Sequence, residues 1–222
     1  MAAEAALETG EELLHADLIS IGVLEGRPHM DPMARFTELL DRAKQTPAIA
    51  EPTGMTLSTV GPDGRPSARI VLLKGVDPDG LVFYTNTRSR KGRDIAANAD
   101  VALTFWWPQL ESQVRFEGPA LPVSAAEADA YFASRPRVSQ LGAWASDQSA
   151  LLRTREELES RFNELERKYE GKVVPRPPHW SGYRVAPLAV EFWRNRPGRL
   201  HERQLYTRPS PDAPWSMVLL NP

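Results

Sequence analysis

The 222-residue sequence contains no cysteine and only four histidines, His15, His29, His179 and His201. The absence of thiols excludes disulfides, thiolate nucleophiles, iron–sulfur clusters and cysteine-ligated zinc. No two histidines are spaced i, i+4 as in a helical zinc site, so we expect no metal centre. Demanding chemistry in this protein is therefore expected to come from an organic cofactor.

Long apolar runs and an excess of positive charge are also missing. No segment approaches the ~20 apolar residues of a membrane span, and the N-terminus lacks the basic start and apolar core of a signal peptide. Lys plus Arg number 27 against 29 for Asp plus Glu, giving a net charge of -2, so nucleic acid is not an expected partner. We expect a folded cytoplasmic protein that contacts neither membrane nor nucleic acid.

Most of the chain has the pattern of antiparallel strands. Pro-Asp-Gly turns at 62–64 and 78–80 join short apolar runs, and such turns are typical of β-hairpins and meanders. The predicted strands are 55–60, 69–74, 81–86, 101–107, 113–118, 190–194, 200–207 and 215–220. The sequence therefore predicts a mainly β (α+β) fold, an antiparallel barrel of seven or eight strands with inserted and flanking helices.

Four helices are predicted between these strands. Asp31-Pro32 is a typical helix start, with the helix running to about Lys44, and Ser89 caps a short helix to about residue 97. Capping boxes, Ser124 with Glu127 and Thr154 with Glu157, begin two more, the last reaching Gly171. We expect residues 1–30 to form a mobile arm and residues 31–222 a single domain.

Basic residues mark a candidate phosphate site at the second helix. Arg88-Ser89-Arg90-Lys91-Gly92 combines cations with a helix N-terminus, whose free N–H groups and dipole favour an anion. A solvated basic corner is the alternative reading of this segment. Tyr131, Arg135 and Ser139 recur every fourth residue, so one helix would present all three to a phosphate ester. Pro136 does not fit inside such a helix, and a polar helix end is the alternative reading.

Two further sets of cations lie in predicted strands. Arg69 and Lys74 are five residues apart, so a regular strand would point them to opposite faces, unless a bulge turns one of them. Arg199, His201 and Arg203 alternate, so a strand would place them on one face, where a bound anion would relieve their repulsion. A surface strand with outward-pointing basic residues is the alternative.

Ten short motifs give the chain a resemblance to a known family. They are Arg69-Ile-Val-Leu-Leu-Lys74, Phe83-Tyr-Thr-Asn86, Ser89-Arg-Lys-Gly92, Gln113-Val-Arg115, Tyr131-Phe-Ala-Ser-Arg135-Pro, Gly142-Ala-Trp-Ala-Ser146, Gln148-Ser149, Pro175-Arg-Pro-Pro-His-Trp180, Glu191-Phe-Trp193 and Arg199-Leu-His201-Glu-Arg203. Their identity and order resemble the pyridoxamine 5′-phosphate oxidases over about residues 31–222.

The resemblance implies an FMN-binding split β-barrel that forms a homodimer with the flavin at the subunit interface. The cofactor-binding residues it implies are Arg69, Ile70, Val71, Leu72, Leu73, Lys74, Tyr84, Thr85, Arg90, Lys91, Gln113, Gln148, Ser149, Trp193 and Arg203. The substrate-binding residues it implies are Lys74, Tyr131, Arg135, Ser139, Arg199 and His201, of which Arg199 and His201 would be catalytic.

The resemblance further implies oxidation of the vitamin B6 ester pyridoxamine 5′-phosphate, and of pyridoxine 5′-phosphate as a further substrate, to pyridoxal 5′-phosphate, with O2 reduced to H2O2. Two features differ from the family pattern: the N-terminal arm lacks the usual Arg and Tyr of a substrate lid, and Glu202 stands where Asp is usual. Glu also occurs there in oxidases of phenazine biosynthesis, which act on dihydrophenazine carboxylates. That activity, and a non-catalytic flavin or B6 carrier, are the alternatives.

Overall fold

The computed structural model describes residues 31–222, so the predicted N-terminal arm and its missing lid residues lie outside the described part. The helices are α2 (Pro32–Lys44), α3 (Arg90–Ala97), α4 (Ala125–Ser134), α5 (Arg137–Ala145) and α6 (Arg155–Lys168). The strands are β1 (Gly54–Val60), β2 (Pro66–Leu72), β3 (Gly75–Asp77), β4 (Gly80–Asn86), β5 (Asp100–Trp107), β6 (Ser112–Pro122), β7 (Trp180–Val185), β8 (Ala189–Arg194), β9 (Glu202–Thr207) and β10 (Ser216–Leu219).

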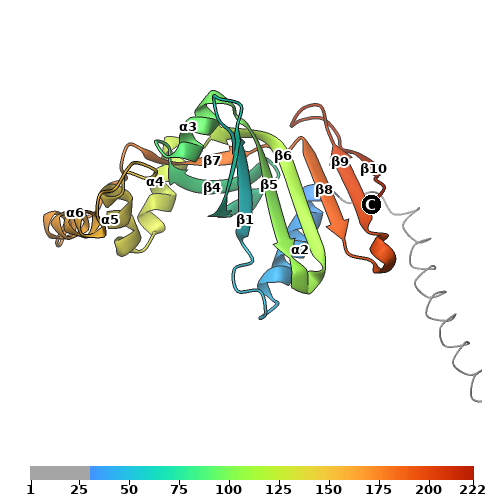
Figure 1. Cartoon of the computed structure of the whole chain (residues 1–222), viewed down its shortest axis with the longest axis horizontal. Helices are drawn as coiled ribbons and strands as arrows, with labels where there is room; N and C mark the ends of the chain where they lie inside the picture. The colour runs from blue at the N-terminus through green and yellow to red at the C-terminus, as the bar shows by residue number, and fades with distance from the viewer. Residues whose placement is uncertain (1–30) are drawn as a thin grey trace, which may run out of the picture.

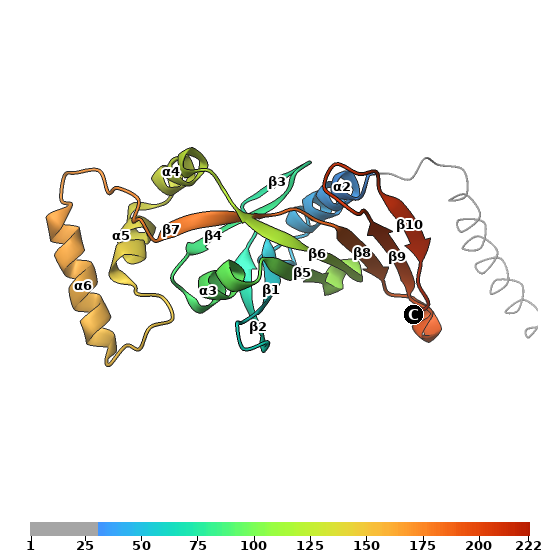
Figure 2. The same ribbon diagram turned by 90° about the horizontal axis from the view of Figure 1, so that it is seen from above.

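The strands form one curled antiparallel sheet, which is the predicted split-barrel architecture (Figure 1). Along its main path the order is β10-β9-β8-β6-β5-β1-β2, while β4 and β7 pair with each other and β7 also pairs with β6. Figure 2 shows an elongated molecule, with α4, α5 and α6 at one end and β8, β9 and β10 at the other. Residues on β2 and β9 are therefore separated by most of the sheet.

Helix α2 packs on the sheet and closes the core. Its Asp31 cap accepts hydrogen bonds from the Met33 and Ala34 N–H groups at 2.8 and 3.1 Å, which confirms the predicted start. Phe36 is fully buried, and its ring centroid lies 4.9 Å from that of Phe105 and 4.7 Å from that of Phe116. Burying these rings provides much of the hydrophobic stabilisation of the barrel.

Three strand predictions were wrong. The predicted strand 69–74 ends at Leu72, because the chain then changes partner: the Leu73 N–H donates to Thr53 O and the Lys74 N–H to Val82 O, at 2.9 and 2.8 Å. Strand β7 was not predicted, because it follows directly on the proline-rich connector and contains Gly182. The short strand β3 was not predicted either, so the sheet has ten strands where seven or eight were expected.

Three predictions at element ends also need correction. Pro136 divides the expected Tyr131–Ser139 stripe between α4 and α5, because proline has no N–H to continue the helix. Strand β9 begins only at Glu202, so Arg199 and His201 precede it, and Arg199 has a left-handed φ of 63°. Helix α6 ends at Lys168, before the predicted Gly171, where a turn with a hydrogen bond from Lys172 N–H to Tyr169 O follows.

In each capping box only the bond between the cap hydroxyl and the backbone N–H forms. Ser124 and Thr154 accept hydrogen bonds from the N–H groups of Glu127 and Glu157 at 3.1 and 3.3 Å, as predicted. The two carboxylates, however, bind arginines: Glu127 accepts from Arg184 at 3.2 Å and Glu157 from Arg161 at 3.1 Å. A charged partner forms the stronger bond, so Glu127 links α4 to β7, while Glu157 pairs with Arg161 one turn later in α6.

Candidate active site

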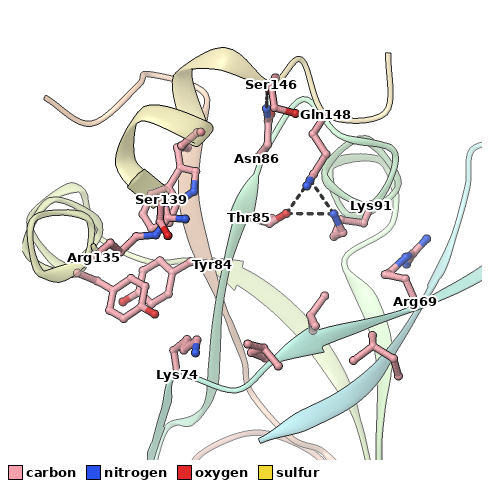
Figure 3. Close-up of a pocket in the computed structure, with 17 residues that line it drawn as sticks. Arg69, Lys74, Tyr84, Thr85, Asn86, Lys91, Arg135, Ser139, Ser146 and Gln148 are labelled. Atoms are coloured by element: carbon pink, nitrogen blue, oxygen red, sulfur yellow. Dashed lines mark hydrogen bonds between the residues drawn. The ribbon is translucent and has the colours of Figure 1, made fainter. Parts of the chain in front are cut away.

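A cavity of about 510 Å³ opens between β2, β4, the start of α3 and the helices α4 and α5 (Figure 3). Figure 3 shows polar side chains pointing into it from two sides. The lining residues are Arg69, Ile70, Val71, Leu72, Lys74, Tyr84, Thr85, Asn86, Lys91, Tyr131, Arg135, Ser139, Gly142, Ala143, Ser146, Gln148 and Trp180. Segments far apart in the sequence therefore meet at one pocket.

One side of the pocket is the start of α3. Buried Ser89 caps the helix by accepting a hydrogen bond from the Gly92 N–H at 3.3 Å. Lys91 Nζ donates to Thr85 Oγ1 and Gln148 Oε1 at 3.1 and 2.8 Å, the triangle drawn in Figure 3. Burial, and then the charge of Arg69, lower the pKa of Lys91. This side therefore gathers positive charge at a helix N-terminus.

Gly92 makes this tight turn possible. A Cβ atom at Gly92 would lie 2.2 Å from the backbone oxygen of Thr87, a distance that no side chain can accept. The Arg90 N–H donates to Ser149 Oγ at 3.1 Å, and Ser149 has a left-handed φ of 73°. A non-glycine residue held in this conformation is strained, and such strain concentrates at functional sites. The rim beside Lys91 is thus a constrained backbone cradle.

The opposite side of the pocket is an aromatic stack with an arginine on it. The Tyr84 and Tyr131 rings are stacked with centroids 4.0 Å apart, and the Tyr84 ring is also stacked on that of Trp180, at 5.4 Å. Arg135 Cζ lies 4.7 Å from the centroid of the Trp180 ring. Burial, with a contribution from Glu127, raises the pKa of Tyr84 to about 12, so its hydroxyl stays protonated.

Arg135 carries a buried donor that no other group in the described part of the chain satisfies. Its Nη1 atom is buried and has no hydrogen-bond partner within residues 31–222. Burial lowers the pKa of Arg135, and the neighbouring Tyr131 only partly opposes this effect. A buried guanidinium nitrogen without a partner is costly, so the site suits a negatively charged ligand.

The residues predicted to bind the substrate phosphate lie together, although neither regular strand spacing nor a single helix brings them there. Lys74, Tyr131, Arg135 and Ser139 all line the same cavity. Arg135 caps the end of α4 and Ser139 lies in the first turn of α5, so the break at Pro136 turns both toward the pocket. Lys74 reaches it from the link between β2 and β3.

Five further predicted residues form a second group, which lies on β6, β8, β9 and the segment just before β9. Gln113 on β6 pairs with Trp193 on β8, which pairs with Arg203 on β9, so the three form one row across the strands. His201 lies beside this row, its ring centroid 4.5 Å from that of Trp193, and its Nδ1 accepts from the Arg196 N–H at 3.3 Å. None of Gln113, Trp193, Arg199, His201 and Arg203 lines the pocket described above.

A buried carboxylate holds the second group in place. Glu191 accepts hydrogen bonds from Arg203 Nε at 2.8 Å and from Arg115 Nη1 at 3.2 Å. The bond to Glu191 raises the pKa of Arg203. Arg69 and Arg203 lie on β2 and β9, five strand positions apart, which is roughly 24 Å along a sheet at ~4.8 Å per strand. Within a single chain, Arg203 is thus separated from the pocket wall on β2 by most of the sheet.

Some predicted residues lie off the cavity wall, and some wall residues were not predicted. Leu73 is buried in the core, while Arg90 and Ser149 lie on the rim beside Lys91. Asn86, Gly142, Ala143, Ser146 and Trp180 line the pocket but were not among the predicted site residues. All five belong to the short motifs that carry the family resemblance, so the signal was present in the sequence.

No group of three or more His, Asp or Glu side chains that could hold a metal ion occurs in residues 31–222. Across the same residues, no helix has the length and apolar character to cross a membrane.

Family comparisons agree with this geometry. The family model described as pyridoxamine 5′-phosphate oxidase matches residues 41–169, which contain the pocket residues from Arg69 to Gln148. The model described as the pyridoxine 5′-phosphate oxidase C-terminal dimerisation region matches residues 180–222, which contain Trp193, Arg199, His201 and Arg203. All members of the second group except Gln113 thus lie in the segment that matches a dimerisation region.

Individual relatives are similar over most of their length. A pyridoxine/pyridoxamine 5′-phosphate oxidase of Myxococcus xanthus is 56% identical over 86% of this chain and 92% of the relative, and one of Rubrobacter xylanophilus is 53% identical over 94% and 95%. Among solved structures, PhzG of Burkholderia lata in complex with tetrahydrophenazine-1-carboxylic acid has a TM-score of 0.81 at 31% identity, covering 88% of this chain and 94% of that one. The chain belongs to the pyridoxamine 5′-phosphate oxidase family.

Proposed function

We propose that this protein is an FMN-dependent oxidase that converts pyridoxamine 5′-phosphate, and also pyridoxine 5′-phosphate, to pyridoxal 5′-phosphate. One observation carries the proposal: the pocket has two separate cationic sides, Lys91 with Arg69 and Arg135 with Lys74. Two phosphate groups, one on the cofactor and one on the substrate, account for both. A single phosphate would leave one of the two cationic sides without a bound anion.

The residues present fit FMN. The start of α3 offers the positive end of the helix dipole, the Lys91 ammonium and the tight backbone turn at Gly92, which together suit a phosphate monoester. Exposed Ile70 and the neighbouring Val71 and Leu72 provide apolar surface along the same wall for a planar ring system. Thr85 and Gln148 add polar groups between the phosphate region at α3 and this apolar wall.

The other cations fit the substrate. Arg135, with its unpartnered Nη1, and Lys74, Tyr131 and Ser139 would hold the phosphate of the B6 ester. Anchoring that phosphate fixes the position of the pyridine ring relative to the cofactor, so most of the rate enhancement comes from placement. The Tyr84 hydroxyl remains neutral at physiological pH because its pKa is raised to about 12, and it adds no negative charge beside the substrate phosphate.

A homodimer would complete the site. Gln113, Trp193 and Arg203 form a row across β6, β8 and β9, and neither this row nor Arg199 and His201 lines the pocket of its own chain. In a two-fold dimer, the C-terminal strands of one subunit would face the pocket of the other. Apolar side chains exposed near both groups, among them Ile70 at 66% and Leu200 at 74%, would be buried by such contact.

The proposed net reaction combines pyridoxamine 5′-phosphate, O2 and water to give pyridoxal 5′-phosphate, ammonia and H2O2. Bound FMN would supply the two-electron chemistry, accepting a hydride from the amine-bearing carbon and passing the electrons to O2. The substrate amine must be neutral to release hydride, and the Arg199 cation placed beside it would favour the neutral form. His201, packed on Trp193, would contact the pyridine ring.

A second candidate is oxidation of a phenazine precursor. It is favoured by the similarity to PhzG, whose structure holds tetrahydrophenazine-1-carboxylic acid, and by Glu202, which here pairs with Arg196. That substrate carries a carboxylate and no phosphate, so it would not use the whole set of Lys74, Tyr131, Arg135 and Ser139. The B6 assignment accounts for all four residues.

Aerobic turnover of the FMN-loaded protein tests the proposal. Pyridoxamine 5′-phosphate, pyridoxamine and tetrahydrophenazine-1-carboxylic acid are supplied separately, and aldehyde formation and H2O2 are measured. We expect turnover with pyridoxamine 5′-phosphate and at least ~10-fold lower kcat/KM with pyridoxamine, because the phosphate contacts are charge-assisted. Turnover of the phenazine compound alone would transfer the assignment to the second candidate.

A further inference from the structure

A buried carboxylate on α3 has no part in the function proposed so far. Asp94 is 4% exposed and does not line the pocket. It lies one turn beyond Ser89 and Lys91 on the same helix. A carboxylate in such a position is costly unless charged or hydrogen-bonding partners surround it, so its contacts indicate what it does.

Those contacts run through a threonine to an arginine of the pocket. Thr59 Oγ1 on β1 donates a hydrogen bond of 2.7 Å to Asp94 Oδ2, with a weaker 3.5 Å contact to Ser67 O. Arg69 Nη1 on β2 donates to the same Thr59 oxygen at 2.7 Å. A hydroxyl has a single proton, so the bond to Asp94 directs that proton away from Arg69 and leaves a lone pair facing the guanidinium.

Further contacts fix the rest of the guanidinium. Arg69 Nη1 also donates to Leu57 O at 3.2 Å, and Nη2 donates to Ser67 Oγ at 2.7 Å. Together with the bond to Thr59, these bonds use three of the five N–H groups, so two are left for a ligand. Arg69 Nη2 lies 3.8 Å from Asp94 Oδ2, close enough for strong electrostatic attraction.

The charge balance shows why Arg69 needs this support. Burial lowers the pKa of Arg69, Asp94 opposes that effect, and the charge of Arg90 lowers the pKa further. The charge of Arg69 in turn lowers the pKa of Lys91. Cations gathered to bind a phosphate repel one another before it arrives, so Arg69 would otherwise turn away from the site.

We propose that Asp94, acting through Thr59, is a positioning residue that holds Arg69 in its FMN-binding orientation before the cofactor binds. The inference rests on the proposed function, because it takes FMN as the ligand of the pocket. Orienting the arginine in advance lowers the entropic cost of binding. Asp94 also ties the helix whose N-terminus faces the cofactor to the strand that carries Arg69.

The test is FMN affinity of the apoprotein, measured by quenching of flavin fluorescence. Asp94→Asn removes the charge at constant size, and we expect the FMN Kd to rise about tenfold or more. Asp100→Asn, which removes an exposed carboxylate at the start of β5, is the matched control and is expected to leave the Kd unchanged. Riboflavin, which lacks the phosphate, is titrated in parallel and is expected to lose less affinity than FMN.

A double-mutant cycle separates positioning from a general loss of structure. If Asp94 acts through Arg69, then Asp94→Asn has little further effect on FMN affinity in an Arg69→Ala background. Full additivity of the two changes, or an unchanged Kd in Asp94→Asn while the wild-type protein binds FMN, would overturn the inference. Failure of the wild-type protein to bind FMN would instead refute the proposed function.

Substitutions of Thr59 keep the inference testable if Asp94→Asn does not fold. Thr59→Val removes the hydroxyl at nearly constant volume, whereas Thr59→Ser keeps it. We expect weakened FMN binding in Thr59→Val and wild-type affinity in Thr59→Ser. Equal affinities in the two variants would contradict the role of the hydroxyl relay.

Discussion

At the scale of single residues, the pocket concentrates positive charge that its own side chains do not neutralise. Arg69, Lys91 and Arg135 each have a lowered pKa, and in each case burial is the first cause. A protein maintains such a cost where a ligand offsets it, and perturbed pKa values mark functional sites for this reason. Two predictions follow from individual members of this group.

Arg135→Ala is expected to raise the KM for pyridoxamine 5′-phosphate about 10- to 100-fold, because charge-assisted hydrogen bonds contribute ~1.5–3 kcal/mol. Arg135→Lys should restore only part of the loss, since an ammonium cannot reproduce the planar fork on Trp180. Arg153→Ala, at an exposed arginine, is the control and should behave like wild type. KM is measured by steady-state kinetics. An unchanged KM in Arg135→Ala would show that Arg135 does not bind the substrate phosphate.

Lys91 predicts the pH dependence of FMN binding. A bound phosphate favours the protonated amine, so affinity is complete below the pKa of Lys91 and falls as pH rises through it. Because burial and Arg69 lower that pKa, the fall should begin below the ~10.4 of an ordinary lysine. Fluorescence titrations at increasing pH measure the effect, and riboflavin serves as the phosphate-free reference. The same pH dependence in Lys91→Arg, which stays charged, would assign the fall to another group.

At the scale of elements, the tight entry into α3 gives the pocket its backbone cradle. Gly92→Ala would place a methyl group 2.2 Å from Thr87 O, and backbone cannot move aside as a flexible side chain does. We expect a loss of about 1–3 kcal/mol in the free energy of unfolding of the apoprotein. Gly142→Ala is the matched control, because no atom lies within 4 Å of its added Cβ, and it should be neutral or stabilising.

Urea denaturation of the two apoprotein variants decides this prediction. A lower midpoint for Gly92→Ala and an equal or higher midpoint for Gly142→Ala agree with the described packing. Equal midpoints would mean that the turn between Asn86 and Ser89 adjusts easily, and that the cradle is not rigid.

The elements themselves show what local sequence encodes. The starts of α2 and α3 were predictable because Asp31 and Ser89 satisfy neighbouring N–H groups within three residues. Strand β7 was missed, since its place depends on pairing with β4 and β6, which lie far away in sequence. The end of β2 at Leu72 is also a tertiary effect, because the chain there changes from one partner strand to another.

The site was predictable by motif and not by periodicity. Spacing alone placed Arg69 and Lys74 on opposite faces and treated Tyr131, Arg135 and Ser139 as one helix stripe. The structure brings all five to one pocket through a strand end and a break at Pro136. Asp94 and Thr59 left no signal in the sequence, since their link to Arg69 exists only once α3 packs against β1.

At the scale of the whole molecule, the two groups of site residues predict a shared active site. One copy carrying Lys91→Gln and Arg135→Ala has a defective pocket, and a second carrying Arg199→Ala and Arg203→Ala has a defective C-terminal segment. Each homodimer should be inactive. A heterodimer restores one intact site of two, so random 1:1 association should recover about one quarter of wild-type activity.

The complementation assay is carried out by unfolding, mixing and refolding the two variants with FMN. Wild-type protein taken through the same treatment gives the reference activity. Absence of recovered activity, with heterodimers present by mass spectrometry of differently tagged copies, would mean that the sites are built within single chains. The proposed arrangement across the dimer would then be wrong.

The central claim is that this pocket brings FMN and a B6 phosphate ester together for electron transfer. Its most direct test is the absorbance of the oxidised flavin after anaerobic addition of pyridoxamine 5′-phosphate to the FMN-loaded protein. We predict rapid loss of that absorbance, much slower loss with pyridoxamine, and return of the oxidised spectrum on admitting O2. A flavin that stays oxidised in the presence of pyridoxamine 5′-phosphate would contradict the claim.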